Sequence, residues 1–456
     1  DGMRDLEAFW ARPRHVVFVC GAAVSGAEAA AACADRDILT IVLEQNARPY
    51  GKIEDGLPRW HDKLRSQEYG RIDECLSRPN VLFVPRTVLG RDVKLEELTP
   101  SAGVAALLLA NGAWRDRPLP VPGVDALPQG VDQGFMYQNK FVHWFNHYDD
   151  RDYDGPRYQV PDGAIVVGGG LASIDVVKIL HVELYRKALQ ARGIDVSVVE
   201  LEHQGIPKTL AAHKLTAEQL GIRGATLYYR RRVRDMPVAS PKDDSPEQLA
   251  KTEGVREKLV GVLAQKYLVR VEGCHAPVAP IVEHGKLAGL RFRKSELQNG
   301  KLVEIAGSDY DVRAPLTVSS IGSVPEPIAG VPRKGELYDF ANMSTGEVRG
   351  LPHVFGLGNV LTGKGNIKDS RESARDVSNQ LLADYLGVGG GDAVGLLDGA
   401  HTGAAERGAQ AADRAAARPV AQPAEIKALC ERVRGLWSAS GFDGDYRTWI
   451  AAHPPS

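Results

Sequence analysis

Residues 164–180 read AIVVGGGLASIDVVKIL, and this stretch decides the fold class. Four apolar residues lead into three glycines and then into a run with helical spacing. A buried strand, a glycine turn and a helix in this order open a dinucleotide-binding βαβ unit. The turn has the form G-x-G-x-x-S, and a helix that begins there offers free N–H groups to a pyrophosphate. We expect the turn and the first helical residues to bind it: Gly168, Gly170, Leu171, Ala172 and Ser173.

The strand that returns from this helix is expected at Ala225–Tyr229, and a run of arginines follows it. A carboxylate at this place in a dinucleotide-binding unit selects NAD, whereas arginines can hold the 2′-phosphate of NADP through paired hydrogen bonds. Arg230 and Arg231 therefore indicate NADP. The alternative is a solvated basic run that binds no ligand.

A second unit of the same kind lies near the start of the chain. It has expected strands at His15–Cys20 and Ile38–Leu43, with a helix at 27–34 between them. The turn GAAVSG (21–26) is G-x-A-x-x-G, so an alanine stands where a glycine normally lets the backbone approach the pyrophosphate. Glu44 follows the second strand, 18 residues after the turn, where a carboxylate can bind a ribose. The expected ligand-binding residues are Gly21, Ala23, Ser25, Gly26 and Glu44; the alternative is a Rossmann-like unit without a nucleotide.

Composition excludes several other classes of protein. The chain has 456 residues, of which 43% are hydrophobic, as in ordinary globular proteins. Its formal net charge of −2 argues against nucleic acid as a partner. No apolar run approaches the roughly 20 residues that a membrane span needs. The N-terminal residues lack the apolar core of a secretory signal, so we expect a cytoplasmic protein. The five cysteines form no CxxC or CxxxxC pair, which argues against an iron–sulfur cluster, a zinc site or a dithiol centre, and no metal is expected.

The two units suggest an α/β fold with two Rossmann-like, three-layer dinucleotide-binding domains and a C-terminal helical extension. Further strands are expected at 104–109, 316–321 and 353–356, and they place the second domain inside the first. The predicted division is 1–150 with 315–386 for the first domain and 151–314 for the second. Residues 387–423 are rich in Gly and Ala and are predicted to be a linker. Residues 424–456 form the extension, with an amphipathic helix at 424–437.

Other motifs make the chain resemble a known family. GGGLASIDVVKIL (168–180) is similar to GxGNVALDVARIL, and FVHWFN (141–146) resembles FVxWYN. GRDV (90–93) resembles a GRD turn, and GLGNVLTGKGNI (356–367) resembles a glycine-rich segment that returns to a flavin. Together these motifs resemble the adrenodoxin reductase family of ferredoxin–NADP reductases over residues 14–386. YRR with MP at 236–237 is also similar to the small subunit of glutamate synthase.

The resemblance implies FAD on the first unit and NADP on the second. It adds expected FAD-binding residues outside the first turn: Gly51, Gly358, Asn359, Gly365, Asn366 and Ile367. His61 matches the family's histidine near the flavin and is the one expected catalytic side chain, for charge stabilisation or proton relay. Asn359 stands where related flavoproteins usually have an aspartate. The cysteine-rich module of the glutamate synthase subunit is absent.

The resemblance implies an FAD-containing NADPH-dependent oxidoreductase that passes electrons to a ferredoxin-like carrier. A second reading makes the chain an electron-input subunit of a larger redox enzyme. Apolar residues of the 424–437 helix (Leu429, Val433, Leu436 and Trp437) motivate it, and they leave an oligomer open. A third reading, motivated by Ala23 and Asn359, is a flavoprotein fold that has lost its cofactor and serves in binding or assembly.

Overall fold

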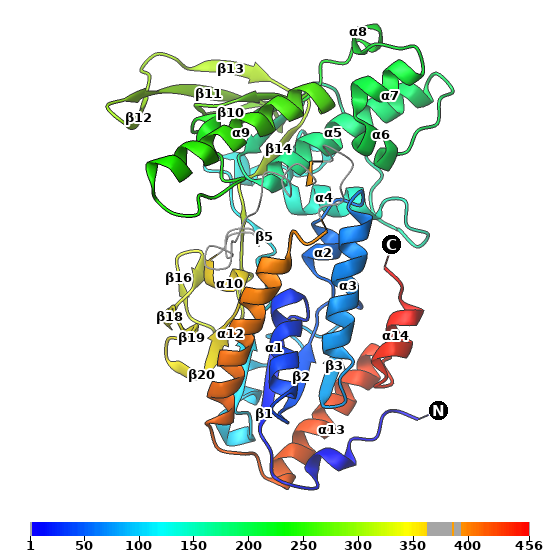
Figure 1. Cartoon of the computed structure of the whole chain (residues 1–456), viewed down its shortest axis with the longest axis vertical. Helices are drawn as coiled ribbons and strands as arrows, with labels where there is room; N and C mark the ends of the chain where they lie inside the picture. The colour runs from blue at the N-terminus through cyan, green and yellow to red at the C-terminus, as the bar shows by residue number, and fades with distance from the viewer. Residues whose placement is uncertain (1, 363–384, 387–393, 456) are drawn as a thin grey trace.

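The structure, a computed structural model, describes residues 2–362, 385–386 and 394–455. Two lobes are joined end to end (Figure 1). The first contains the N-terminal and C-terminal parts of the chain, and the second contains the middle part, drawn mostly in green. Each lobe is built on a largely or wholly parallel sheet. The predicted α/β class with two Rossmann-like units is therefore confirmed.

The first lobe contains a seven-stranded sheet in the order β18-β19-β20-β4-β1-β2-β3. The five strands from β20 to β3 pair in parallel, while β18 and β19 form an antiparallel edge. β1 and β2 are buried along their whole length, as their uninterrupted apolar sequences predict. The bounds are Val16–Cys20 (β1), Leu39–Leu43 (β2), Val81–Val84 (β3), Ala106–Leu109 (β4), Phe340–Asn342 (β18), Glu347–Val348 (β19) and Leu351–Gly356 (β20).

Helix α1 (Val24–Ala34) follows β1, and a helix from near the other end of the chain packs on it. This partner is α12 (Asp398–Ala416), which lies beside α1 in Figure 1. The two backbones approach closely, because a Cβ on Gly408 would lie 2.9 Å from the Cα of Ala29. The predicted linker at 387–423 is thus wrong for residues 398–416. Small residues there allow close helix packing, and they do not indicate a flexible segment.

His401 links α12 to two other helices through hydrogen bonds. Its Nδ1 lies 2.9 Å from a carboxylate oxygen of Glu28 on α1, and its Nε2 hydrogen-bonds Glu68 on α3 (Asp62–Leu76). Burial by itself would lower the pKa of His401, but the hydrogen bonds to the two carboxylates outweigh it and raise that pKa to about 9. A raised pKa means that the folded state binds the proton more tightly than the unfolded chain.

We therefore expect His401→Gln to lower the free energy of unfolding most at pH values below the ordinary histidine pKa of 6.5. The loss should be roughly 1–2 kcal/mol after allowance for solvent screening, and it should shrink as the pH rises toward about 9. Urea unfolding of both proteins across this range measures the difference. A difference that stays constant or grows with pH would contradict the ionised pairing.

The second lobe contains a five-stranded parallel sheet in the order β6-β14-β7-β8-β9. Its first and second members, β6 and β14, were predicted to belong to the first domain. The chain crosses between the lobes at a two-stranded ribbon of β5 and β15, near residues 116 and 323 rather than 150 and 315. The bounds are Arg115–Asp116 (β5), Phe135–Tyr137 (β6), Ile165–Gly168 (β7), Thr226–Tyr228 (β8), Arg270–Glu272 (β9), Thr317–Ser320 (β14) and Ser323–Val324 (β15).

Helices and a smaller sheet surround this second sheet. An antiparallel sheet of β10 to β13 packs beside it, as Figure 1 shows, and the long α5 follows β7. Short α2 and α4 meet where the two lobes join. The bounds of these elements are Lys52–Asp55 (α2), Gln138–His147 (α4), Leu171–Gln190 (α5), Val198–Gln204 (α6), Ile206–Ala212 (α7), Ala217–Leu220 (α8), Pro246–Tyr267 (α9), His275–Glu283 (β10), Lys286–Gln298 (β11), Lys301–Glu304 (β12) and Tyr310–Arg313 (β13). The first lobe also contains Arg333–Lys334 (β16), Leu337–Tyr338 (β17) and Asn359–Thr362 (α10).

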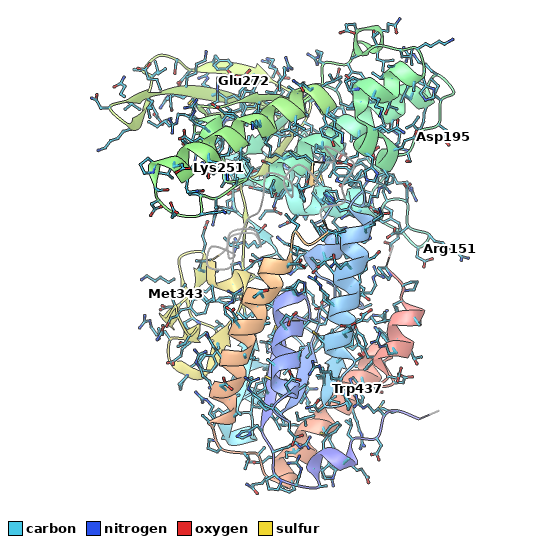
Figure 2. All side chains as sticks on the ribbon, in the orientation of Figure 1. Arg151, Asp195, Lys251, Glu272, Met343 and Trp437 are labelled. Carbon is cyan, nitrogen blue, oxygen red and sulfur yellow. The ribbon has the colours of Figure 1, made fainter. Side chains whose placement is uncertain are left out.

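The C-terminal helices α13 (Pro423–Ser440) and α14 (Tyr446–Ala452) complete the first lobe. Trp437 of α13, labelled in Figure 2, is fully buried and donates a hydrogen bond of 2.8 Å to the carbonyl of Phe83 on β3. Leu429, Val433 and Leu436 are buried in the same core. The apolar side of this helix is therefore covered by its own chain. An oligomer through the extension remains a prediction with no structural support from these residues.

No helix in the described part of the chain is long and apolar enough to span a membrane. The cytoplasmic location expected from the sequence stays a prediction.

Candidate functional site

The first glycine turn lies at the carboxyl end of β1, where α1 begins. Gly21 has a φ of +95°, and a Cβ on it would lie 2.5 Å from the carbonyl oxygen of Ala110. A Cβ on Gly26 would lie 1.8 Å from the carbonyl oxygen of Gly21. Both positions thus require glycine, for the tight turn and for close packing of the helix. No side chain caps the N-terminus of α1, so its free N–H groups suit an anionic ligand.

Ala23, the residue that departs from the usual pattern, lies against the segment before α2. A Cβ on Gly51 would come within 2.8 Å of the Ala23 methyl, and Gly51 itself has a φ of +54° and a ψ of −133°. The methyl group therefore fits because residue 51 has no side chain. This contact joins two predicted binding residues that are 28 positions apart in the sequence.

Gly51→Ala should lower the free energy of unfolding by about 1–3 kcal/mol, since alanine must adopt a backbone conformation reserved for glycine. It must also meet the Ala23 methyl. The double variant Ala23→Gly/Gly51→Ala removes the clash but not the backbone strain, so we expect it to recover part of the loss. Urea denaturation of the three proteins gives the two contributions. Equal stability of Gly51→Ala and the unaltered chain would contradict the close approach.

Glu44 lies beside the same turn, as predicted. Its two carboxylate oxygens accept hydrogen bonds from the backbone N–H groups of Ala22 (3.1 Å) and Asn46 (2.8 Å). Burial raises the pKa of Glu44 to about 7, although these N–H groups counteract part of the effect. The carboxylate is thus held at the end of β2, next to the turn. A ribose diol bound there would find an acceptor already oriented by the backbone.

The chain returns to the first turn after β20. Gly358 has a φ of +68°, and a Cβ on it would lie 2.3 Å from the Oγ of Ser25. Asn359 begins the short helix α10 directly after it. Gly358 therefore lies against Ser25 of the first turn, and Asn359 follows it in the chain. That both residues bind FAD stays a prediction. Gly365, Asn366 and Ile367 lie outside the described residues, so their predicted part in binding stays untested.

The second glycine turn lies at the carboxyl end of β7 and opens α5. A Cβ on Gly168 would lie 2.2 Å from the carbonyl oxygen of Ser320, whereas the space around Gly170 is open. The Oγ of Ser173 donates a hydrogen bond of 2.6 Å to the carbonyl of Gly170 and stabilises the turn. Leu171 is buried, and Ala172 is exposed at the start of the helix. The uncapped helix end and the open space at Gly170 fit a bound pyrophosphate.

The arginines at 230–232, after β8, differ in whether they make close ion pairs within the protein. Arg232 binds both carboxylate oxygens of Asp235, at 2.9 and 2.7 Å, and lowers the pKa of that carboxyl. Arg231 is 57% exposed and has only a long contact of 3.7 Å with Asp235. Arg230 is exposed, with no ion pair to any residue that the structure describes. Arg230 and Arg231, which were singled out from the sequence, are thus exposed and make no close ion pair with any described residue.

His61, the expected catalytic residue, lies in a buried position. Its ring stacks on Tyr385 at 4.6 Å, and its Nε2 is buried without a hydrogen-bond partner among the described residues. Burial, with the nearby charge of Lys178, lowers the pKa of His61 to about 3. A lowered pKa favours the neutral form of the imidazole. Both expected roles of His61, charge stabilisation and proton relay, stay predictions.

Sequence reasoning missed a cluster of buried charges beside His61. Lys178 is fully buried and lies 2.6 Å from a carboxylate oxygen of Glu202, between the rings of Trp60 and Tyr267. Asp175, one turn earlier on α5, accepts a hydrogen bond from Tyr385. Burial raises the pKa of Asp175 to about 7. The sequence shows that Asp175 and Lys178 are spaced to lie on the same face of a helix. Their burial depends on Trp60, Tyr267 and Tyr385, which are distant from them in the sequence.

Two separate glycine turns, each opening a helix at the carboxyl end of a parallel sheet, define a two-domain dinucleotide-binding fold. No family model matches the chain. Among curated proteins it is similar to NADPH-ferredoxin reductase FprA of Mycobacterium leprae, at 24% identity over 83% of the chain and 86% of the relative. It is also similar to the mitochondrial NADPH:adrenodoxin oxidoreductase of Arabidopsis thaliana (22%; 64% and 63%) and the glutamate synthase [NADPH] small chain of Mycobacterium tuberculosis (24%; 82% and 70%).

Among solved structures, Mycobacterium tuberculosis FprA in complex with NADPH aligns with a TM-score of 0.62 at 18% identity. The alignment covers 93% of this chain and 90% of FprA, so the two share a fold over nearly their whole length. The resemblance predicted from the motifs is confirmed as a similarity: the chain is similar to proteins named NADPH-ferredoxin reductase and NADPH:adrenodoxin oxidoreductase and to a glutamate synthase small chain.

Proposed function

We propose that the chain is an FAD-containing oxidoreductase that takes electrons from NADPH and passes them to a ferredoxin-like acceptor. The observation that carries the proposal is the pair of glycine turns, of which only the second is followed by two exposed arginines. This asymmetry supports different dinucleotides in the two lobes: NADP in the lobe with Arg230 and Arg231, and FAD in the lobe with Glu44.

The residues of the first lobe would bind FAD through backbone groups and one carboxylate. The turn at 21–26 and the N-terminus of α1 would hold the pyrophosphate, and Glu44 would bind the adenosine ribose. Ser25 and Gly358 touch each other across the turn, so both lie at the same edge of the sheet. When bound, FAD supplies a ring system that accepts hydride from NADPH and releases electrons singly.

The residues of the second lobe would orient NADPH. The N-terminus of α5 and the open space at Gly170 would hold its pyrophosphate, and Arg230 and Arg231 its 2′-phosphate. The imidazole of His61 lies near the buried charges of Lys178 and Glu202, and its stacking on Tyr385 fixes the orientation of the ring. Protein residues thus bind and orient, and no side chain acts as a nucleophile.

The direct test is reduction of an iron–sulfur carrier. The FAD-loaded chain is mixed anaerobically with NADPH and a [2Fe–2S] ferredoxin, and ferredoxin reduction is followed by its loss of visible absorbance. We expect catalytic turnover that depends on NADPH, FAD and the chain together. A chain that binds FAD and oxidises NADPH but leaves several ferredoxins oxidised would overturn the proposed acceptor.

A second candidate function is electron input to a partner subunit. It is supported by the similarity to a glutamate synthase small chain and by the Tyr229-Arg230-Arg231 and Met236-Pro237 motif. The acceptor assay separates the two candidates. An electron-input subunit would reduce artificial dyes at the expense of NADPH but would reduce free ferredoxin poorly.

A further inference from the structure

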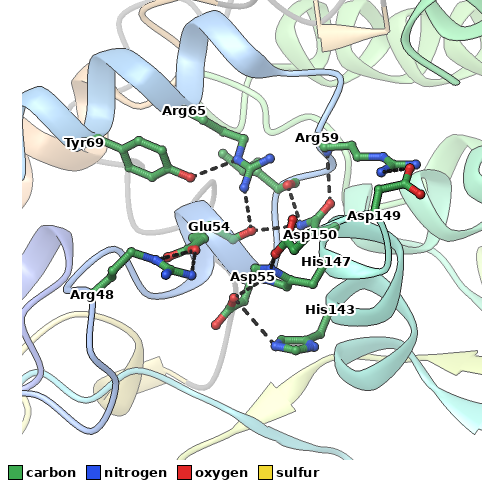
Figure 3. A network of polar contacts seen from close by, with 12 residues as sticks. Arg48, Glu54, Asp55, Arg59, Arg65, Tyr69, His143, His147, Asp149 and Asp150 are labelled. Carbon is green, nitrogen blue, oxygen red and sulfur yellow. Dashed lines mark hydrogen bonds and ion pairs between the residues drawn. The ribbon is translucent and has the colours of Figure 1, made fainter. Parts of the chain in front are cut away.

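Two histidines and an aspartate meet where the lobes join, outside the two glycine turns. His143 and His147 lie one turn apart on α4, with ring centroids 4.4 Å from each other. Asp55, the last residue of α2, directs Oδ1 toward both rings, at 2.8 Å from Nε2 of His147 and 3.9 Å from Nε2 of His143. Figure 3 shows the three side chains converging on one point.

The spacing of these atoms suits a small cation. In a tetrahedral site with ligands about 2.0–2.2 Å from the metal, ligand atoms lie about 3.3 Å apart. The observed 2.8 and 3.9 Å bracket this value, and the three ligand atoms all lie within 4.8 Å of one another. Small side-chain rotations would therefore place all three at bonding distance from one ion.

A fourth residue orients the buried histidine. Nδ1 of His147 lies 2.7 Å from a carboxylate oxygen of Asp150, which leaves Nε2 facing Asp55. Histidines that bind metals usually have such a carboxylate on the other ring nitrogen, which sets the tautomer and the ring direction.

The backbone that carries the three residues is held in place by neighbouring contacts. The side-chain amide of Asn146 donates hydrogen bonds of 2.9 Å to the carbonyls of Glu54 and Leu57, and it accepts one of 3.0 Å from the N–H of Arg59. These bonds fix α2 against α4. Because these hydrogen bonds hold the two helices together, the site keeps its geometry without the ion. Side-chain atoms of His143 are 53% exposed, so an ion and a water molecule have access.

We propose that Asp55, His143 and His147 bind one divalent transition-metal ion, with Zn²⁺ the best match to two imidazoles and a carboxylate. Three protein ligands and one water molecule complete a tetrahedral shell. The ion links α2 to α4 and so restricts movement of one lobe relative to the other. This site departs from the sequence-based expectation of no metal, which considered cysteines only. It does not depend on the proposed oxidoreductase activity.

The test uses the full-length chain after removal of metal with a chelator, and Zn²⁺ as the probe in isothermal titration calorimetry. We expect one ion per chain with micromolar or tighter affinity and a rise in melting temperature. His143→Ala should weaken binding at least about 10- to 100-fold, because it removes a ligand rather than an outer contact. It should leave the melting temperature of the metal-free protein unchanged, since His143 is exposed.

His213→Ala is the matched control, because this histidine is also exposed but directly follows α7, which lies away from the joint between the lobes in Figure 1. It should bind Zn²⁺ as the unaltered chain does. Titration with Co²⁺ gives an independent readout, since tetrahedral Co²⁺ absorbs in the visible region. No stoichiometric binding, or binding equal in His143→Ala and the unaltered chain, would overturn the site. Either result leaves flavin binding and NADPH oxidation untouched.

Discussion

The double variant Arg230→Ala/Arg231→Ala is expected to bind NADPH about 100-fold more weakly, with little change toward NADH. Each charged hydrogen bond to a phosphate contributes about 1–3 kcal/mol, and 1.4 kcal/mol corresponds to a factor of ten. Both arginines are exposed after β8, and the structure gives them no strong ion pair that would compete for the ligand. The loss should appear in the KM for NADPH more than in kcat, because the 2′-phosphate lies far from the reacting ring.

Arg234→Ala is the control for this variant. Arg234 belongs to the same basic run, but it is directed at Glu257, at 2.6 Å, and Glu253, at 3.7 Å. Its loss removes one positive charge from the same basic run, against two in the double variant, and removes no expected phosphate contact. Steady-state kinetics with both nucleotides compare the variants. Equal losses with NADPH and NADH would mean that Arg230 and Arg231 do not bind the 2′-phosphate.

Lys178→Met is expected to lower the free energy of unfolding by about 3–5 kcal/mol. The variant leaves Glu202 buried without its counter-ion, and an unpaired buried charge is strongly destabilising. The hydrogen bond from Tyr267 to the same carboxylate, at 3.0 Å, is too little to replace the ammonium group. The free energy of unfolding, measured with urea, gives the size of the effect.

The double variant Lys178→Met/Glu202→Leu removes both charges and should recover most of the loss, because well-packed apolar residues often replace a buried pair at little cost. Arg36→Ala is the matched surface control. Its ion pair with Asp413 at 2.6 Å lies at the surface, so its loss should change the free energy of unfolding by less than about 1 kcal/mol. A double variant less stable than Lys178→Met alone would contradict the charge-pair explanation.

The parts of the fold that local sequence determines were predicted closely. The strand expected at 15–20 is observed at Val16–Cys20, and the helix after the second turn runs through Leu171–Gln190. Both glycine turns, Glu44 and the available arginines lie where their spacing placed them. Each depends on a strand, a turn and a helix within about 30 residues, so the pattern is legible without the rest of the chain.

The parts that depend on distant residues were missed. The sequence of α12 predicts a Gly/Ala-rich linker, because the packing of its small residues against Ala29 of α1 is not evident from the sequence. The crossing points at β5 and β15 involve short strands with no periodicity to detect. Asp55 lies about 90 residues from His143 and His147, so no spacing rule joins them. Burial of Lys178 likewise depends on the helices around it.

The central claim is that one chain holds FAD and NADPH in two lobes so that hydride passes between them. The most direct measurement is the absorbance of the purified, FAD-reconstituted chain near 450 nm during anaerobic titration with NADPH and, separately, with NADH. Our account predicts a yellow protein that is bleached by about one equivalent of NADPH, with NADH far slower. A chain that stays colourless after incubation with FAD, or whose flavin NADPH does not bleach, would contradict it.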